Sequence, residues 1–147
     1  MRSKAKTVLA FGSFDIVHPG HLSYLEKARR LGSKLIVVVA RDSTIRMLKK
    51  HEPVFRERER LRMIRALRFV DMAALGNRVK DRDGIYEILG RYKPDIIALG
   101  YDQRADVEKM KKYLCERGIR ARIVRIGLNA SEAKYKSSSL SAVSRPH

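Results

Sequence analysis

Short apolar runs alternate with amphipathic stretches along this chain. Near-continuous apolar runs occupy residues 7–11, 35–40, 96–99 and 123–126, and a weaker run occupies residues 72–75. Runs of this kind are typical of strands that are buried on both faces of a sheet. Amphipathic patterns of helical period occupy residues 21–31, 43–50, 57–67, 85–92 and 105–117. Gly32 and Gly118 follow two of these helices, and glycine commonly caps a helix end.

This alternation predicts an α/β fold, with a single doubly wound, Rossmann-like parallel sheet of five strands and helices on both faces. The chain has 147 residues and contains no internal repeat or linker-like tract, so we expect one domain over residues 1–147. Sheets of this class bind ligands at the carboxyl ends of their strands, where the strand order reverses. Residues that directly follow a strand are therefore the first candidates for chemistry.

The first strand is followed by the segment GSFDIVHPGH, residues 12–21. Gly12 lets the chain leave the strand sharply and brings its backbone close to a ligand. His18 and His21 fall around the first turn of the next helix, where unpaired N–H groups and the helix dipole favour an anion. Gly20 leaves that helix end open. The pattern indicates a phosphate clamp that stabilises charge on a transferring phosphoryl group, and two histidines that merely cap a helix are the structural alternative.

GSFDIVHPGH resembles the GTFDxxHxGH signature of the cytidylyltransferase-like nucleotidyltransferases, which include glycerol-3-phosphate cytidylyltransferase, phosphopantetheine adenylyltransferase and the archaeal FAD synthases. Later segments match in the same order, so the resemblance covers almost the whole chain. It implies transfer of a nucleoside monophosphate to a phosphate-bearing acceptor with release of pyrophosphate. His18 and His21 would then be catalytic. The segment would contribute these nucleotide-binding residues: Gly12, Ser13, Phe14, His18, Pro19, Gly20 and His21.

Basic residues later in the chain are candidates for holding the β- and γ-phosphates. The second strand leads into a helix that ends at Lys49 and Lys50, and the resemblance implies that a lysine in this region reaches the triphosphate. Both lysines stay candidates as catalytic residues, with a solvated helix end as the alternative. Arg60 lies near a helix start where the family commonly carries Glu and Arg. A charged helix with ion pairs three and four residues apart would explain the same arginine.

Two further segments resemble nucleotide-binding parts of the family. Asp102 follows the strand at 96–99 in a stretch that looks like the LGxDQ segment of archaeal FAD synthases, where the Asp contacts nucleotide. Its alternative role is to cap the next helix. The hydroxyl-rich stretch KSSSL resembles a turn at the start of the last helix that binds the triphosphate, and a plain helix cap is again the alternative. Its candidate residues are Ser137, Ser138 and Ser139.

The expected mechanism needs no general base. The acceptor phosphate has a second pKa of about 6 and is therefore ionised near neutral pH. Catalysis then depends on alignment and charge neutralisation at the α-phosphate. The cofactor expected is a divalent metal, magnesium, which bridges the phosphates with few protein ligands. No metal-binding residue is predicted, because His51, His147 and Cys115 have no partners at ligand spacing.

Residues 40–44 and 99–103 resemble the archaeal FAD synthases most, which implies the reaction of FMN with ATP to give FAD and pyrophosphate. Those enzymes carry two cysteines near the C-terminus, whereas this chain reads NASEAK at 129–134. A glycerol-3-phosphate or sugar-phosphate cytidylyltransferase that uses CTP is the alternative within the family. For a flavin, Phe14, Tyr101 or Tyr135 could line the slot that a flat ring needs.

The net charge of +17 attracts polyanions, so a basic nucleic-acid-binding module is the alternative from another class. The arginine-rich stretch 56–68 lacks the interleaved aromatics that such a module uses for stacking, so we expect small-molecule substrates as partners instead. Two Asn and one Gln are few for this length, as in hyperthermophile proteins. A single cysteine, no signal-like N-terminus and no apolar run near 20 residues favour the cytoplasm without a membrane anchor. Related enzymes are often dimers, so a homodimer is compatible with the resemblance.

Overall fold

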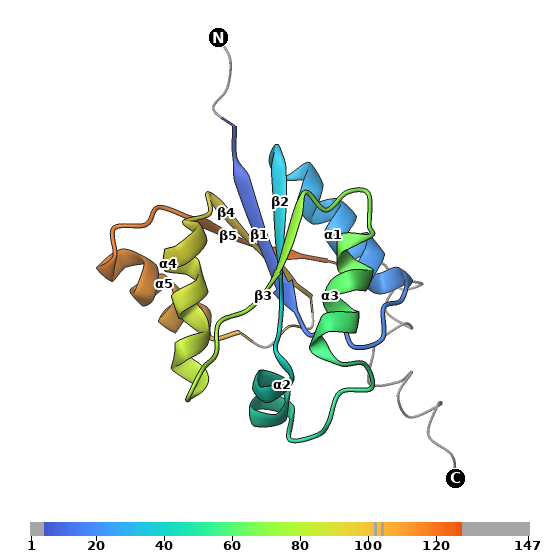
Figure 1. The fold of residues 1–147 in the computed structure, drawn as a ribbon. Coiled ribbons are helices and arrows are strands. Elements are labelled where there is room, and N and C mark those ends of the chain that lie inside the picture. The colour runs from blue at the N-terminus through green and yellow to red at the C-terminus, as the bar shows by residue number, and fades with distance from the viewer. Residues whose placement is uncertain (1–4, 102, 104, 128–147) are drawn as a thin grey trace.

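A parallel five-stranded sheet forms the centre of the molecule (Figure 1). The structure is a computed structural model that describes residues 5–101, 103 and 105–127. The strand order is β3-β2-β1-β4-β5, and every neighbouring pair is parallel. The strands are β1 (Thr7–Gly12), β2 (Lys34–Val39), β3 (Met72–Leu75), β4 (Ile96–Gly100) and β5 (Arg122–Ile126). The predicted α/β fold with five parallel strands is confirmed, and each predicted strand lies within one residue of its observed ends.

Helices connect the strands and cover both faces of the sheet. They are α1 (Pro19–Arg30), α2 (Asp42–Lys49), α3 (Glu57–Arg65), the 3₁₀ helix η1 (Arg82–Tyr86), α4 (Glu87–Tyr92) and α5 (Val107–Glu116). The helix predicted at 85–92 is thus two elements, and η1 begins three residues earlier because Asp81 accepts the N–H of Gly84 as its cap. No helix among the described residues is long and apolar enough to cross a membrane.

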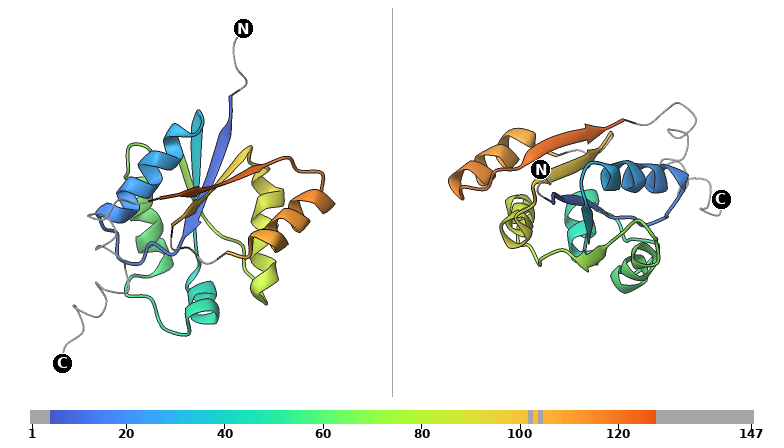
Figure 2. Two further views of the ribbon diagram at one scale, coloured as in Figure 1. Left: turned by 180° about the vertical axis from the view of Figure 1, so that it is seen from behind. Right: turned by 90° about the horizontal axis from the view of Figure 1, so that it is seen from above.

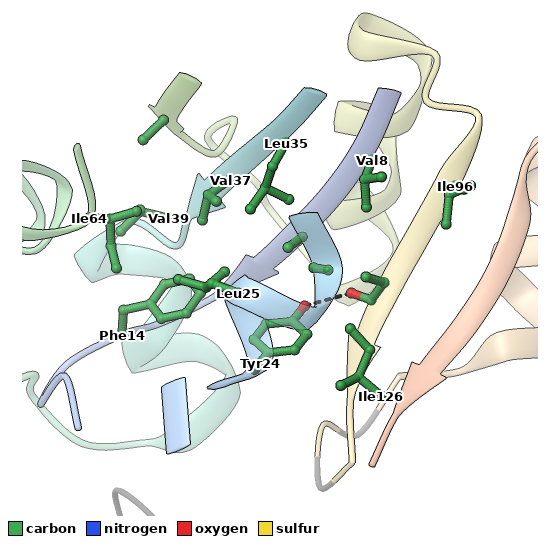
Figure 3. Close-up of a cluster of buried hydrophobic side chains, with 14 of the residues drawn as sticks. Val8, Phe14, Tyr24, Leu25, Leu35, Val37, Val39, Ile64, Ile96 and Ile126 are labelled. Carbon is green, nitrogen blue, oxygen red and sulfur yellow. Dashed lines mark hydrogen bonds between the residues drawn. The ribbon is translucent and has the colours of Figure 1, made fainter. Parts of the chain in front are cut away.

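The helices fall into two layers, and each layer has its own apolar core. α1 and α3 pack on one face of the sheet, whereas α4 and α5 pack on the other (Figure 2). Figure 3 shows the core on the α1 side, where the Tyr24 hydroxyl donates to the carbonyl of Ala98 on β4. Burial raises the pKa of that hydroxyl well above its usual range. α2 lies at the carboxyl ends of the strands (Figure 1).

The two glycines expected to cap helices have different roles. Gly118 follows α5 with a φ of +65°, as a left-handed cap requires. Gly32 is a correction, because its φ is not in the left-handed region and α1 ends at Leu31 in a right-handed conformation. A Cβ at Gly32 would lie 2.6 Å from the carbonyl oxygen of Lys6, so this position needs glycine for close packing against the start of β1.

The carboxyl ends of β1 and β2 are joined by the guanidinium of Arg60, which is fully buried. Its Nη1 donates to the carbonyl oxygens of Ser13 and Ala40, both at 2.7 Å. Its Nε donates to the carbonyl of Phe55 at 2.9 Å, and Nη2 pairs with Asp42 Oδ1 at 2.7 Å. The prediction that Arg60 holds the β- and γ-phosphates is therefore wrong in its direct form, since protein oxygens already occupy a guanidinium that no ligand can reach here.

Replacing Arg60 should destabilise the fold far more than replacing an exposed arginine of the same helix. Arg60→Met leaves Asp42 as a buried carboxylate without its cation, a loss of about 3–5 kcal/mol in the free energy of unfolding. Arg62→Met is the matched control, because Arg62 is exposed and should change stability by less than about 0.5 kcal/mol. Denaturant unfolding of both variants measures the difference. Equal midpoints and slopes for the two variants would contradict this role of Arg60.

Candidate active site

A cavity of about 790 Å³ opens at the carboxyl ends of β1, β2 and β4. This is the place that the fold predicts for a ligand, because the chain order of the strands reverses between β1 and β4. One end of the cavity is polar and is lined by Gly12, Ser13, His18, Gly20, His21 and Lys49. Apolar side chains line much of the rest of the cavity, namely Val38, Ile45, Leu48, Val79, Ile85 and Met110, beside the charged residues Arg82, Asp83, Asp106 and Lys109 of η1, α5 and its cap. The volume is in the range of sites for small ligands.

His18 and His21 stack at the start of α1, with their ring centroids 3.8 Å apart. His18 is the N-cap, and its Nδ1 accepts the N–H of Gly20 at 3.1 Å. The Nδ1 of His21 accepts the N–H of His18 at 3.3 Å, which completes a capping box. A neutral ring whose Nδ1 accepts a hydrogen bond carries its proton on Nε2. The capping role thus uses Nδ1 of each ring, whereas the predicted contact with phosphate would use Nε2.

His21 is held in its neutral form. Its pKa is lowered from 6.5 to about 3, mainly by burial and in addition by the neighbouring His18 and Lys49, whereas a hydrogen bond with the backbone of Ile16 acts in the opposite direction. Its ring therefore carries no positive charge at any pH near neutrality. A neutral ring can stabilise a phosphate oxygen by donating a hydrogen bond rather than as a cation.

Phe14 packs against His21. Its ring meets His21 edge to face, with centroids 5.4 Å apart, and its side chain is only 2% exposed. Its φ of 50° is unusual for a non-glycine residue, and such outliers cluster at functional sites. A Cβ at Gly12 would lie 3.1 Å from the Phe14 ring, so Gly12 is needed for this ring to pack. Phe14 also belongs to the core on the α1 side (Figure 3) and lines the cavity, so its expected place in the slot for a flat ring stays a prediction.

The structure separates the two candidate lysines. The Nζ of Lys49 lies 2.9 Å from the Ser13 hydroxyl, and Lys49 lines the polar end of the cavity. Lys50 is the C-cap of α2, with a left-handed φ of 56°, and it does not line the cavity. Its exposed side chain fits the solvated helix end that was the alternative.

The remaining candidates have mixed positions. Gly20 is buried at the polar end of the cavity, whereas Pro19 is the exposed first residue of α1 and does not line it. Asp102 and Tyr135 lie outside the described residues, as do the three serines Ser137, Ser138 and Ser139. Tyr101 lines the cavity. The roles of all these residues stay predictions.

Two polar side chains that the sequence did not single out hold the loops around the cavity. The carboxylate of Asp15, which is buried, accepts the N–H groups of Val54 at 2.8 Å and Phe55 at 2.9 Å. Gln103 donates to the carbonyl of Phe11 at 2.8 Å and accepts the N–H of Gly100 at 3.1 Å. Asp15 stands within the GSFD part of the signature, but its partners lie 39 and 40 residues away, so no local pattern reveals the contact.

Arg41 and Glu57 form a third such contact, at the end of β2. The Nε of Arg41 donates to the carbonyl of Gly76 at 2.7 Å, and its Nη1 pairs with Glu57 at 3.1 Å. Glu57 also accepts the N–H of Asp42 at 3.2 Å. Arg41 also lines the cavity.

Carboxylates do not gather at the polar end. Within the described part of the chain, no group of three or more His, Cys, Asp or Glu side chains could hold a metal ion. The divalent metal expected from the sequence stays a prediction.

Comparisons with known proteins agree with this geometry. The family model described as cytidylyltransferase-like matches residues 9–143. The FAD synthase of Methanothrix thermoacetophila is 51% identical over 126 residues, which cover 86% of this chain and 84% of that protein. The FAD synthase of Archaeoglobus profundus is 46% identical over 131 residues, which cover 89% of this chain and 80% of that protein.

Solved structures show the same fold. A lipopolysaccharide core biosynthesis protein from Thermoplasma volcanium superposes with a TM-score of 0.78 at 41% identity, over 86% of this chain and 99% of that one. A pantoate-beta-alanine ligase from Francisella tularensis, at 14% identity and a TM-score of 0.60, covers 97% of this chain and 70% of its own and shares the fold alone. The match of the family model over nearly the whole chain, together with relatives about half identical, shows that this chain belongs to the cytidylyltransferase-like family.

Proposed function

We propose that this protein transfers AMP from ATP to FMN, forming FAD and pyrophosphate. The observation that carries the proposal is the cavity, in which a polar cluster of His18, His21 and Lys49 adjoins an apolar wall. The first accommodates phosphates and the second accommodates a flat aromatic ring. The relatives named FAD synthase support this reading, and this chain covers 84% of the one from Methanothrix thermoacetophila.

In this mechanism, an oxygen of the FMN phosphate attacks the α-phosphorus of ATP, and the bond from that phosphorus to the bridging oxygen of pyrophosphate breaks. His18 and His21 lie where the α-phosphate would meet the N-terminus of α1, and their Nε2–H groups would donate to its oxygens as charge develops. Lys49 would neutralise the leaving pyrophosphate. Magnesium, bound mainly through the phosphates, would supply further charge neutralisation.

The apolar wall favours a flavin over the alternative acceptors. The cavity is lined by the apolar side chains of Val38, Ile45 and Met110, which can pack against a flat ring. A polyol or sugar phosphate would instead need several converging hydrogen-bond donors and acceptors. These apolar residues would line the isoalloxazine slot together with Phe14 or Tyr101, which also line the cavity. A glycerol-3-phosphate or sugar-phosphate cytidylyltransferase is the reading to be tested against this one. A nucleic-acid-binding module as the main function is not favoured by the cavity or by the family.

The first test is the reaction itself. The purified protein with magnesium, FMN and ATP should yield FAD and pyrophosphate, and CTP should be the poorer donor. Chromatography of the mixture separates FMN from FAD, and a pyrophosphate assay gives the stoichiometry. The same preparation with CTP and glycerol 3-phosphate or a sugar phosphate is the control. A CDP-linked product there, with no FAD from the first mixture, would assign the protein to the alternative.

Replacing His18 by Asn should remove catalysis but keep the fold. Asn is among the best N-cap residues, so its side-chain oxygen can accept the N–H of Gly20 in place of Nδ1. It cannot place a donor where Nε2–H lies, so kcat should fall by about 10²–10³-fold with little change in the unfolding temperature. The matched control is His51→Asn, since His51 is exposed and lies away from the cavity. Near-normal turnover by the His18 variant would refute the phosphate clamp.

Lys49→Ala and Lys50→Ala should differ although the residues are adjacent. Lys49 lies beside Ser13 in the cavity, so its loss should lower kcat or raise the KM for ATP, by about 10²-fold in kcat/KM. Lys50→Ala should stay within about twofold of the unaltered protein, because its side chain is exposed outside the cavity. Steady-state kinetics with varied ATP measures both. If Lys49→Ala left kcat and KM unchanged, both lysines would belong to a solvated helix end without a role in catalysis.

A further inference from the structure

We infer that Arg41 binds the phosphate group of the acceptor, and this inference rests on the proposed function. Nucleotide binding at the start of α1 accounts for the polar end of the cavity, and the apolar wall accounts for a ring. The acceptor phosphate must lie between these two parts, because one of its oxygens has to reach the α-phosphorus while the ring stays on the wall. Arg41 lines the same cavity at the end of β2, next to the end of β1 from which the phosphate-binding segment continues.

The backbone fixes where Arg41 stands. Ala40 N–H donates to the carbonyl of Gly12 at 2.9 Å, so the last hydrogen bond between β2 and β1 comes one residue before Arg41. The N–H of Gly76 donates to Val39 at 2.9 Å and holds the end of β3 in the same way. Arg41 therefore leaves the sheet beside the phosphate-binding segment on one side and beside the turn after β3 on the other.

Its guanidinium is oriented before any ligand arrives. Nε donates to the carbonyl of Gly76 and Nη1 to the carboxylate of Glu57, which fixes the plane of the group from two directions. Within the described residues, Nη2 has no hydrogen-bond partner. The side chain is 24% exposed, so part of it is open to solvent. A planar group held in this way can bind a phosphate through its remaining N–H donors with little further loss of side-chain entropy.

The other cations of the cavity are less suited to this task. Lys49 contacts Ser13 at the nucleotide end. Lys109 pairs with Asp83 at 3.2 Å, and both side chains are more than half exposed. Arg82 is an exposed residue of η1. Arg41 is thus the cation that lies at the end of β2 beside the phosphate-binding segment and is held by its neighbours in the described structure.

The test compares two flavins that differ only in the phosphate. Titrations that follow flavin fluorescence, with magnesium and without nucleotide, measure the Kd of FMN and of riboflavin. The unaltered protein should bind FMN more tightly than riboflavin. Arg41→Gln should raise the Kd of FMN by about 10- to 100-fold, as expected for a lost hydrogen bond between charged groups, and should leave the Kd of riboflavin unchanged. The KM for FMN should rise in the same proportion, and the KM for ATP should stay constant.

Arg46→Gln is the matched control, because Arg46 lies on the adjacent helix α2, is exposed, and pairs with Glu52 outside the cavity. Arg41→Lys is the second variant and serves if the glutamine variant does not fold. It keeps the charge but cannot contact Gly76 and Glu57 together, so it should recover part of the preference for FMN.

The outcomes are distinct. An unchanged preference for FMN in a folded Arg41 variant, or equal loss of FMN and riboflavin binding, would overturn this inference and leave the proposed function standing. A protein that binds neither flavin and forms no FAD would overturn the proposed function, and the inference with it.

Discussion

The buried ion pair between Arg60 and Asp42 holds together the parts that form the cavity. A guanidinium without solvent is costly unless protein groups satisfy it, and here the acceptors are the carbonyls just beyond β1 and β2 together with the Asp42 carboxylate and the carbonyl of Phe55. The hydrogen bonds that make this burial tolerable also determine where the phosphate-binding segment leaves the sheet. Stability and the geometry of the site therefore depend on the same side chain.

A layer of polar contacts extends outward from this pair. Asp15 fixes the loop between α2 and α3 through two backbone N–H groups, and Glu57 joins Arg41 to the start of α2. Each contact links segments that are far apart in sequence but converge at the ends of the strands. The charged residues below the cavity therefore have a structural role, whereas those at its surface can contact a ligand. Arg41 can do both, because it pairs with Glu57 and also lines the cavity.

The sequence predicted the sheet well because strands buried on both faces are written as apolar runs, and their ends differ from the observed ones by at most one residue. It also located the segment from Gly12 to His21, since a strand followed by HPGH has few structural explanations. Arg60 was misjudged because α3 begins with alternating Glu and Arg, a pattern typical of a solvated helix. The helical period did hold the signal: Arg60 shares the buried stripe of Leu61 and Ile64, whereas Arg58 and Arg62 are exposed. Lys49 and Lys50 could not be separated from sequence, because their directions depend on a left-handed residue at the helix end.

The neutral His21 makes the fold sensitive to acid. In an unfolded chain this imidazole takes up a proton near pH 6.5, whereas in the folded chain it does so only near pH 3. Between these values the unfolded state binds the extra proton, so the stability of the folded state falls as the pH falls, by about 1.4 kcal/mol for each pH unit from this residue alone. The same protonation would take away the ring nitrogen that accepts the N–H of His18. Acidification thus weakens the start of α1, where the phosphates would bind. Because burial keeps the ring neutral, burial also limits how acidic an environment the folded protein can tolerate.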